Sequence, residues 1–222
     1  MKKATLMLAL STAVAMNANA SQENIDRAAK GTTESPISIL VMANALASQG
    51  IEQKDPLLLV TSAKLLKLNA IETKARQKVA EGGSKSSKEG RERYTPDRLL
   101  EYAQEWSGDN KAYKSLIAQV ESLQTRGRVG GAAQHVDAVD AGASDHYELM
   151  FYGREWAEVA VIGDGDTDLD LYVRDENGNV VCEDADSTDT MYCAWKPKFD
   201  GNFTISIKNY GEVYNEYLIM TN

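Results

Sequence analysis

Side chains that carry enzyme chemistry are scarce in this sequence of 222 residues. It has only two histidines, His135 and His146, and none of the patterns HExxH, GxSxG or SxxK that place a catalytic zinc ion or nucleophile. A lone histidine with such flanks is far more often a surface or turn residue than a catalyst. We therefore predict that the protein is not an enzyme. The alternative, a hydrolase with an unrecognised site in the helical half, would need a pocket with a perturbed acid or base.

Long hydrophobic runs are also missing. The apolar run from Ala4 to Val14 is too short to span a bilayer, which takes about 20 residues. It follows two lysines and precedes Ala18-Asn19-Ala20, an arrangement typical of an export signal. We predict cleavage between Ala20 and Ser21, a periplasmic or secreted location, and no membrane span after removal of the signal. An uncleaved membrane anchor is the alternative.

Cysteine is limited to Cys182 and Cys193. No CxxC motif or neighbouring histidine is present to complete a zinc site. In the oxidising compartment that export implies, such a pair usually closes. We therefore predict a Cys182–Cys193 disulfide, which contributes about 3 kcal/mol in the loop-entropy treatment.

Basic residues are rare in the C-terminal third. Residues 143–222 hold 17 Asp and Glu against 5 Lys and Arg, a net charge of −12, whereas residues 1–142 hold 16 against 19, a net charge of +3. The acidic third would repel phosphate, which argues against a nucleic-acid partner and favours a cation, although the charge could serve solubility alone. Four basic residues lie close together in the other part, and they are expected either in a solvated loop or against the acidic third of the same or another molecule. They are Lys85, Lys88, Arg91 and Arg93.

Helix signals fill the first half of the chain. Three capping residues precede proline, and this pattern predicts helix starts at Ser35-Pro36, Asp55-Pro56 and Thr95-Pro96. A fourth helix is predicted from about Asn110 to Leu123. We expect Gly50 to end the first helix, and the second helix to run to about Thr73. Residues 81–93 have no apolar side chain and are read as a flexible, solvated loop.

The hydrophobic period changes to 2 from His146 onward. Short apolar segments separated by turns, among them Asn177-Gly178, predict an antiparallel β-sandwich. The predicted fold is therefore α+β with several domains: a small all-α domain followed by a jelly-roll-like sandwich. We predict a signal peptide over 1–20, a helical domain over 21–123, a Gly/Ala-rich linker over 124–143 and the sandwich over 144–222.

Aspartates alternate with apolar residues in the stretch GDGDTDLDLYV, residues 163–173. The EF-hand pattern fails because Leu169 stands where that loop needs glycine. In a strand, the aspartates would share one face and their mutual repulsion would favour a hard cation among them. A solvated acidic face is the alternative. The predicted calcium ligands are Asp164, Asp166, Asp168, Asp170, Asp184 and Asp186.

The run 166–173, the Asn-Gly turn, the cysteine pair around an acidic loop and Gly201-Asn202-Phe203 together resemble the bacterial pre-peptidase C-terminal domain family over residues 144–222. This resemblance implies a jelly-roll-like sandwich that often binds calcium and is appended to secreted peptidases. It also implies that Asp137, Asp140 and Asp145 could join the calcium site. The helical part resembles no family known to us, and it is no peptidase in any pattern we recognise.

We therefore expect an exported, non-enzymatic protein whose calcium-binding sandwich is a stabilising or adhesive binding module. The expected partner is a protein or an extracellular polymer. The alternative is a periplasmic interaction or assembly protein whose helical domain binds the partner while the sandwich is scaffold. An exposed aromatic patch on the sandwich would favour the first function, and an apolar groove between the helix pairs would favour the second.

Overall fold

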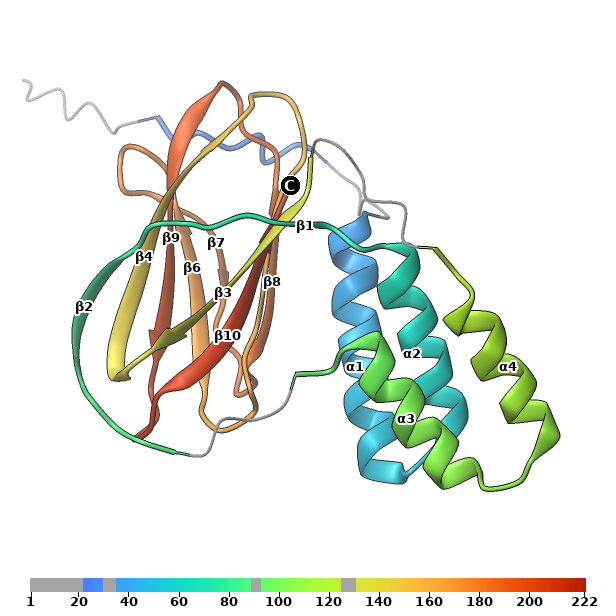
Figure 1. Ribbon diagram of the computed structural model, residues 1–222. Helices are drawn as coiled ribbons and strands as arrows, with labels where there is room; N and C mark the ends of the chain where they lie inside the picture. Colours follow the sequence, from blue (N-terminus) through green and yellow to red (C-terminus); the bar gives the residue numbers. More distant parts are fainter. Residues whose placement is uncertain (1–21, 30–34, 89–92, 125–130) are drawn as a thin grey trace, which may run out of the picture.

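A helical bundle lies beside a sandwich of two five-stranded sheets (Figure 1). The computed structural model describes residues 22–29, 35–88, 93–124 and 131–222. The helices are α1 (Pro36–Gln53), α2 (Pro56–Leu68), α3 (Pro96–Ser107) and α4 (Lys111–Glu121). The predicted α+β class, with a jelly-roll-like sandwich after the helices, is confirmed.

Sheet A has the strand order β1-β3-β10-β5-β8, and sheet B has the order β2-β4-β9-β6-β7. The strands of sheet A are β1 (Glu72–Thr73), β3 (Ala133–Val139), β10 (Asn215–Thr221), β5 (Ala157–Ile162) and β8 (Thr190–Trp195). Those of sheet B are β2 (Val79–Ser84), β4 (Ala141–Phe151), β9 (Gly201–Asn209), β6 (Leu169–Arg174) and β7 (Val180–Asp184). All pairings are antiparallel except β1 with β3.

The helix starts follow the predicted caps. The side chains of Ser35, Asp55 and Thr95 each accept a hydrogen bond from a backbone N–H of the first turn. The prediction that Gly50 ends α1 is wrong, because the helix continues to Gln53. A Cβ at Gly50 would lie 2.6 Å from Leu59 Cδ2, so this glycine permits the close packing of α1 on α2. Helix α2 also ends earlier than predicted, at Leu68.

The segment between α2 and α3 belongs to the sandwich and not to the bundle. We call residues 72–84 the strap: its β1 pairs with β3 of sheet A, and its β2 pairs with β4 of sheet B. The predicted helical domain over 21–123 is therefore wrong for residues 72–84, which belong to the sandwich. The predicted flexible loop over 81–93 is wrong for residues 81–84, which are part of β2. Every residue of β2 is exposed, so the strand lacks the alternating pattern that marks a half-buried strand in a sequence.

The predicted linker over 124–143 is also wrong from Ala133 onward, where β3 and then β4 begin. The prediction failed because a segment rich in Gly and Ala has the composition of a linker. In the structure, its residues Ala133, Ala141 and Ala143 are buried in the sandwich. The sandwich therefore contains residues 133–143 as well as the predicted 144–222.

The predicted disulfide between Cys182 and Cys193 is confirmed. It joins β7 to β8, which are edge strands of different sheets. At the opposite edge the strap spans the two sheets, with β1 beside β3 and β2 beside β4. The sandwich is thus closed at one edge by a covalent bond and at the other by a crossing segment.

The N-terminal segment 22–29 also packs on the sandwich. Ile25 is part of the sandwich core, and the buried Asn24 donates its backbone N–H to Asp175 and accepts from the backbone N–H of Lys198. Ala20 and Ser21, the predicted cleavage site, lie outside the described residues. Among the described residues, no helix is long and apolar enough to cross a membrane.

Two neighbouring glycines of β2 test whether the strap packs as described. Both have positive φ, but a Cβ at Gly83 would lie 2.5 Å from Ala143 Cβ, whereas one at Gly82 would meet nothing closer than 4.0 Å. We expect Gly83→Ala to lower the free energy of unfolding by about 1–3 kcal/mol more than Gly82→Ala, because it adds overpacking to the backbone cost that the two share. Urea unfolding of both variants measures the difference, and equal losses would contradict the β2–β4 register.

Candidate functional site

A cavity of about 390 Å³ lies between the bundle and sheet A. One wall comes from α1 and α2, with Leu40, Ala45 and Leu66. The facing wall is the outer surface of sheet A, with Val136 of β3 and Leu218 of β10. Both walls are mainly apolar, and the Val136 side chain is 44% exposed.

Packed side chains beside the cavity hold the bundle on sheet A. Ile37 and Leu40 of α1 form one buried cluster with Ala160 of β5 and Met220 of β10. Close packing of this kind fixes the distance between the two walls. The cavity is therefore a feature of the assembled fold and not of either part alone.

Charged residues line the rim of the cavity. Arg93, just before α3, pairs with Glu216 of β10, with Nη2 3.0 Å from Oε1. The Nζ of Lys67 donates to the backbone oxygens of Val120 and Glu121 at the end of α4. Asp164 also belongs to the rim.

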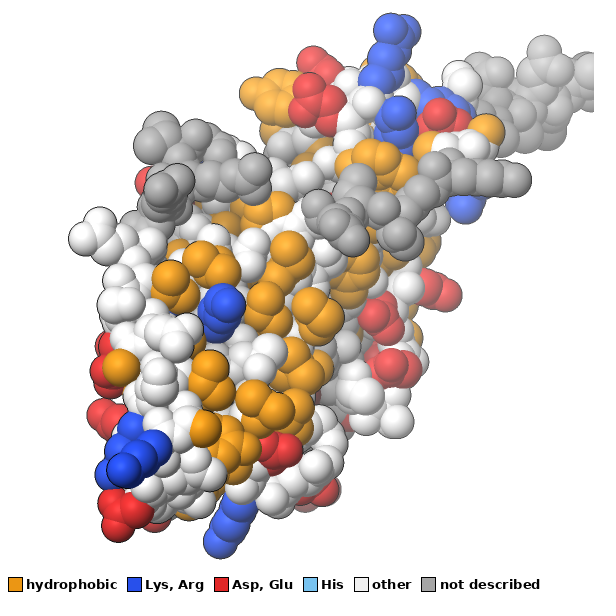
Figure 2. Space-filling view, turned by 90° about the vertical axis from the view of Figure 1, so that its right-hand side faces the viewer, with side chains coloured by type: hydrophobic (Ala, Val, Ile, Leu, Met, Phe, Trp, Pro, Cys, Tyr) orange, Lys and Arg blue, Asp and Glu red, His pale blue; other side chains and the backbone are white. Residues whose placement is uncertain are grey.

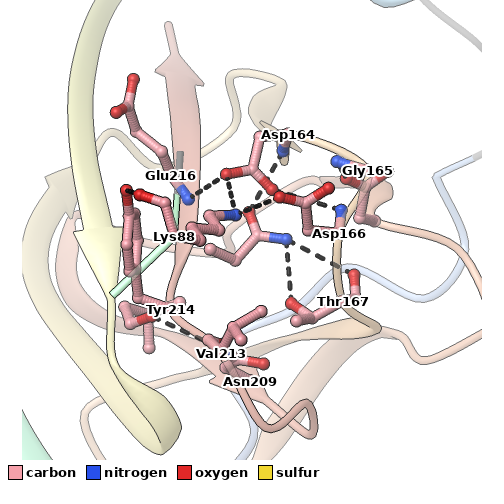
Figure 3. Close-up of polar contacts among 12 residues, drawn as sticks. Lys88, Asp164, Gly165, Asp166, Thr167, Asn209, Val213, Tyr214 and Glu216 are labelled. Carbon is pink, nitrogen blue, oxygen red and sulfur yellow. Dashed lines mark hydrogen bonds and ion pairs between the residues drawn. The ribbon is translucent and has the colours of Figure 1, made fainter. Parts of the chain in front are cut away.

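The acidic loop before β6 meets a lysine from the chain just after the strap (Figure 3). The Nζ of Lys88 lies 2.5 Å from Asp164 Oδ2 and 2.6 Å from Asp166 Oδ2. The Lys88 and Asp164 side chains are only 10% and 7% exposed. Burial opposes the charged amine, but the hydrogen bonds that it donates to the two carboxylates outweigh this effect and raise the pKa of Lys88. The Tyr214 ring, 4.7 Å from Nζ, adds a cation–π contact.

Further hydrogen bonds fix the carboxylate of Asp164. Its Oδ2 accepts the backbone N–H of Glu216 at 2.9 Å, and its own N–H donates to Asn215 Oδ1. The Nδ2 of Asn215 in turn donates to Thr167 Oγ1. The loop, β10 and Lys88 therefore form one connected polar network at the rim of the cavity.

The other predicted calcium ligands lie elsewhere. Asp168 is exposed, and Asp170 is buried and accepts a hydrogen bond from Tyr172 Oη at 2.7 Å. Asp184 accepts from the Tyr192 N–H and Asp186 from the Thr188 N–H, so both serve the β7–β8 connection. Of the three further aspartates that the family resemblance suggested, Asp140 pairs with Lys85, while Asp137 and Asp145 share Lys78.

This arrangement does not fit a calcium ion at the predicted site. In the described part of the chain, no group of three or more His, Cys, Asp and Glu residues is placed to hold a metal. The two aspartates that do converge already enclose the ammonium group of Lys88, and calcium needs 6–8 oxygen ligands. Calcium binding stays a prediction from the sequence, and it would require displacement of Lys88.

Reasoning from the sequence found the acidic loop and named a basic segment as one possible partner, but it did not predict that Lys88 would bind Asp164 and Asp166. The expectation that the basic segment meets the acidic third of the same molecule is confirmed for Lys88 and Arg93. Lys85 pairs with Asp140, just before that third, and Arg91 lies outside the described residues. The opposite charges of the basic segment 85–93 and the acidic loop 163–170 were the only feature of the sequence that indicated this contact. The cavity could not be predicted, because its walls come from segments whose contact no sequence pattern reports.

Comparison with known proteins gives weak likenesses only. No family model matches the chain, and no curated protein matches it. Aeromonas hydrophila PliG, a periplasmic inhibitor of g-type lysozyme, is 13% identical over 41% of this chain and 85% of that chain, with a TM-score of 0.32. The pre-peptidase C-terminal domain of a Bacillus anthracis collagenase is 8% identical over 41% of this chain and 77% of that chain, with a TM-score of 0.28. A Yersinia pseudotuberculosis mitogen is 11% identical over 42% of this chain and 86% of that chain, with a TM-score of 0.30. These TM-scores are too low to support an argument.

Lys88→Met tests whether the ammonium group is the cation of the acidic loop. We expect a loss of about 2–3 kcal/mol in the free energy of unfolding, because Asp164 stays buried without its counter-charge while Asp166 is screened by solvent. Lys85→Met is the matched control, since that side chain is 91% exposed and its ion pair should matter little. An equal effect of the two substitutions would contradict the role of Lys88.

Thermal unfolding with calcium and with a chelator completes this test. We expect calcium to leave the Tm of the wild-type protein unchanged and to raise that of Lys88→Met, because a ligand stabilises only if it binds the folded state. A rise in the wild-type protein that Asp168→Ala abolishes would instead establish the calcium site predicted from the sequence.

Proposed function

We propose that this is an exported, non-enzymatic binding protein whose ligand site is the cavity between the bundle and sheet A. The observation that carries the proposal is the cavity itself: its volume of about 390 Å³ falls in the range of small-ligand pockets, about 300–1,000 Å³. The bundle and sheet A each contribute a wall of the cavity. The proposal therefore explains why the protein has a helical part, which an adhesive or scaffolding role of the sandwich does not.

The lining favours an amphipathic ligand. Its apolar body would bury Val136, Leu218 and the facing side chains of α1. Its polar end would meet the rim, where Arg93 and Glu216 are each about one-third exposed and can exchange their mutual ion pair for a ligand group. Lys67 is less available, because it already bonds the last carbonyl groups of α4.

The chemistry of the lining supports binding and not catalysis. No histidine or cysteine is among the described residues that line the cavity. Its acidic groups are engaged: Asp164 by Lys88, Glu216 by Arg93 and Asp189 by the backbone N–H of Gly165. A nucleophile with an adjacent base, as covalent catalysis requires, is not assembled from these described residues.

Export and family membership belong to the proposal as well. The signal-like first twenty residues and the disulfide support export, since disulfides persist in oxidising compartments. The pre-peptidase C-terminal motifs in 144–222 lie within an observed sandwich, and we propose this family for that part of the chain.

A second candidate function is binding of a partner by the outer face of the bundle. Figure 2 shows hydrophobic side chains gathered on that side of the molecule. Four large hydrophobic side chains of the bundle are exposed to solvent: Met42, Leu57, Leu68 and Leu116. Three aromatic side chains of the sandwich are exposed, namely Tyr152, Phe199 and Tyr210, but Phe199 and Tyr210 lie at opposite ends of β9 and do not form one patch.

Anilinonaphthalene sulfonate, an amphipathic fluorescent probe, tests the cavity directly. Ala45 is an exposed residue of α1 that lines the cavity, so Ala45→Trp fills it without disturbing a core. Gln49→Trp is the matched control, because Gln49 is exposed on the same helix but does not line the cavity. We expect saturable binding to the folded protein that Ala45→Trp weakens at least tenfold and Gln49→Trp leaves unchanged.

Binding that survives in Ala45→Trp would contradict the cavity as the site. If the same binding is lost in Leu57→Ser combined with Leu116→Ser, the second candidate function is supported instead. Circular dichroism of each variant confirms that the fold is retained.

A further inference from the structure

Three charged side chains meet inside the edge of the sandwich that the strap closes. Lys78 stands just before β2, Asp137 is on β3 of sheet A and Asp145 is on β4 of sheet B. The Nζ of Lys78 lies 2.7 Å from Asp137 Oδ1 and 2.7 Å from Asp145 Oδ2. It also donates to the backbone oxygen of Ala138 at 2.6 Å, so its position is fixed by both sheets.

Asp145 is the buried member of the group. Its side chain is 1% exposed, and its Oδ2 also accepts a hydrogen bond from Tyr217 Oη at 2.8 Å. Burial raises the pKa of Asp145, in spite of the hydrogen bonds from Lys78 and Tyr217. The acid form of this carboxyl is therefore more accessible than in an exposed aspartate.

Asp137 is in the opposite situation. Burial opposes its charged form too, but hydrogen bonds from Lys78 and from the Ala138 N–H hold the pKa of Asp137 below its usual range. The Tyr147 hydroxyl donates to its other oxygen at 3.2 Å. The lysine amine thus lies between one carboxyl that favours the acid and one that favours the carboxylate.

We propose that Lys78 and Asp145 condense to an intramolecular amide, an isopeptide bond between the strap and β4, with Asp137 as the base. Asp137 accepts a proton from the Lys78 ammonium group, and the neutral Nζ attacks Cγ of the protonated Asp145. The new C–N bond forms, and Asp137 returns its proton to the departing hydroxyl, which leaves as one water molecule. The second proton on the attached nitrogen passes to solvent, which balances the proton that the Asp145 carboxylate took from solvent beforehand. An ammonium and a carboxylate are consumed, an amide and water are produced, and no oxidant or other reactant is needed.

The fold supplies what this condensation requires. Contact at hydrogen-bond distance replaces an encounter in solution, and positioning of this kind can accelerate an intramolecular reaction greatly. The Tyr217 hydroxyl contacts the oxygen on which negative charge develops during the attack. The product would be a covalent tie at the edge opposite the Cys182–Cys193 disulfide, so both edges of the sandwich would be closed by a bond.

Intact-mass spectrometry of the purified full chain decides the proposal. We expect the wild-type mass to be one water molecule below the mass calculated from its sequence with one disulfide, and a tryptic digest to contain a single branched peptide that holds Lys78 and Asp145. Trypsin should also fail to cleave after Lys78. A mass without this deficit, and cleavage after Lys78, would overturn the proposal and leave an ordinary buried ion pair.

Substitutions separate the nucleophile from the base. Lys78→Arg keeps the positive charge but removes the amine, and we expect the full, unlinked mass. Asp137→Asn keeps the size of the side chain but removes the base, and we expect most of the protein to stay unlinked. Lys85→Arg, which changes an exposed lysine outside the group, should keep the mass deficit. A complete mass deficit in Asp137→Asn would overturn the role of Asp137, and one in Lys78→Arg would overturn the assignment of the linked residue.

Discussion

Residues 72–84 pair with sheet A through β1 and with sheet B through β2, and the remainder of the structure depends on this double pairing. The strap leaves the bundle at the end of α2 and returns to it shortly before α3, so the chain is attached to the sandwich in the middle of the bundle. Figure 1 shows this path across the sheets. Because the attachment is internal, the bundle cannot move away from sheet A as a domain on a single linker can. The cavity between them therefore keeps its walls.

Charge distribution follows from the same path. The basic side chains of residues 78–93 would be a solvated cluster in an isolated loop. Those that the structure describes each meet an acidic partner of the sandwich: Lys78 at Asp137 and Asp145, Lys85 at Asp140, Lys88 at Asp164 and Asp166, and Arg93 at Glu216. The excess of negative charge in residues 143–222 is thus partly neutralised from within the chain. This internal neutralisation, and not a metal ion, is what the geometry of the acidic loop supports.

Residue patterns predicted the elements well where burial was one-sided. Caps such as Ser35 and Thr95 marked helix starts, and alternation in 147–173 marked strands, because each pattern reflects a local physical preference. They failed where the decisive contact was distant. The fully exposed β2 is held in place by backbone pairing, which leaves no hydrophobic pattern in the sequence. Ala143 belongs to the core although its segment has the composition of a linker. Gly50 does not end α1 but allows it to pack closely on α2. The aspartates at 164 and 166 were found, but Lys88, 76 and 78 positions earlier, completes their site.

The rigid attachment of bundle to sandwich is tested most directly by unfolding the mature chain in urea with two probes. Far-ultraviolet circular dichroism reports mainly the helices, and in a Trp106→Phe variant the remaining tryptophans, Trp156 and Trp195, report the sandwich by fluorescence. Coincident transitions with one midpoint are expected, since the strap makes the two parts one cooperative unit. Two separated transitions, with helices lost while tryptophan fluorescence stays native, would show that the parts fold independently and would contradict this conclusion.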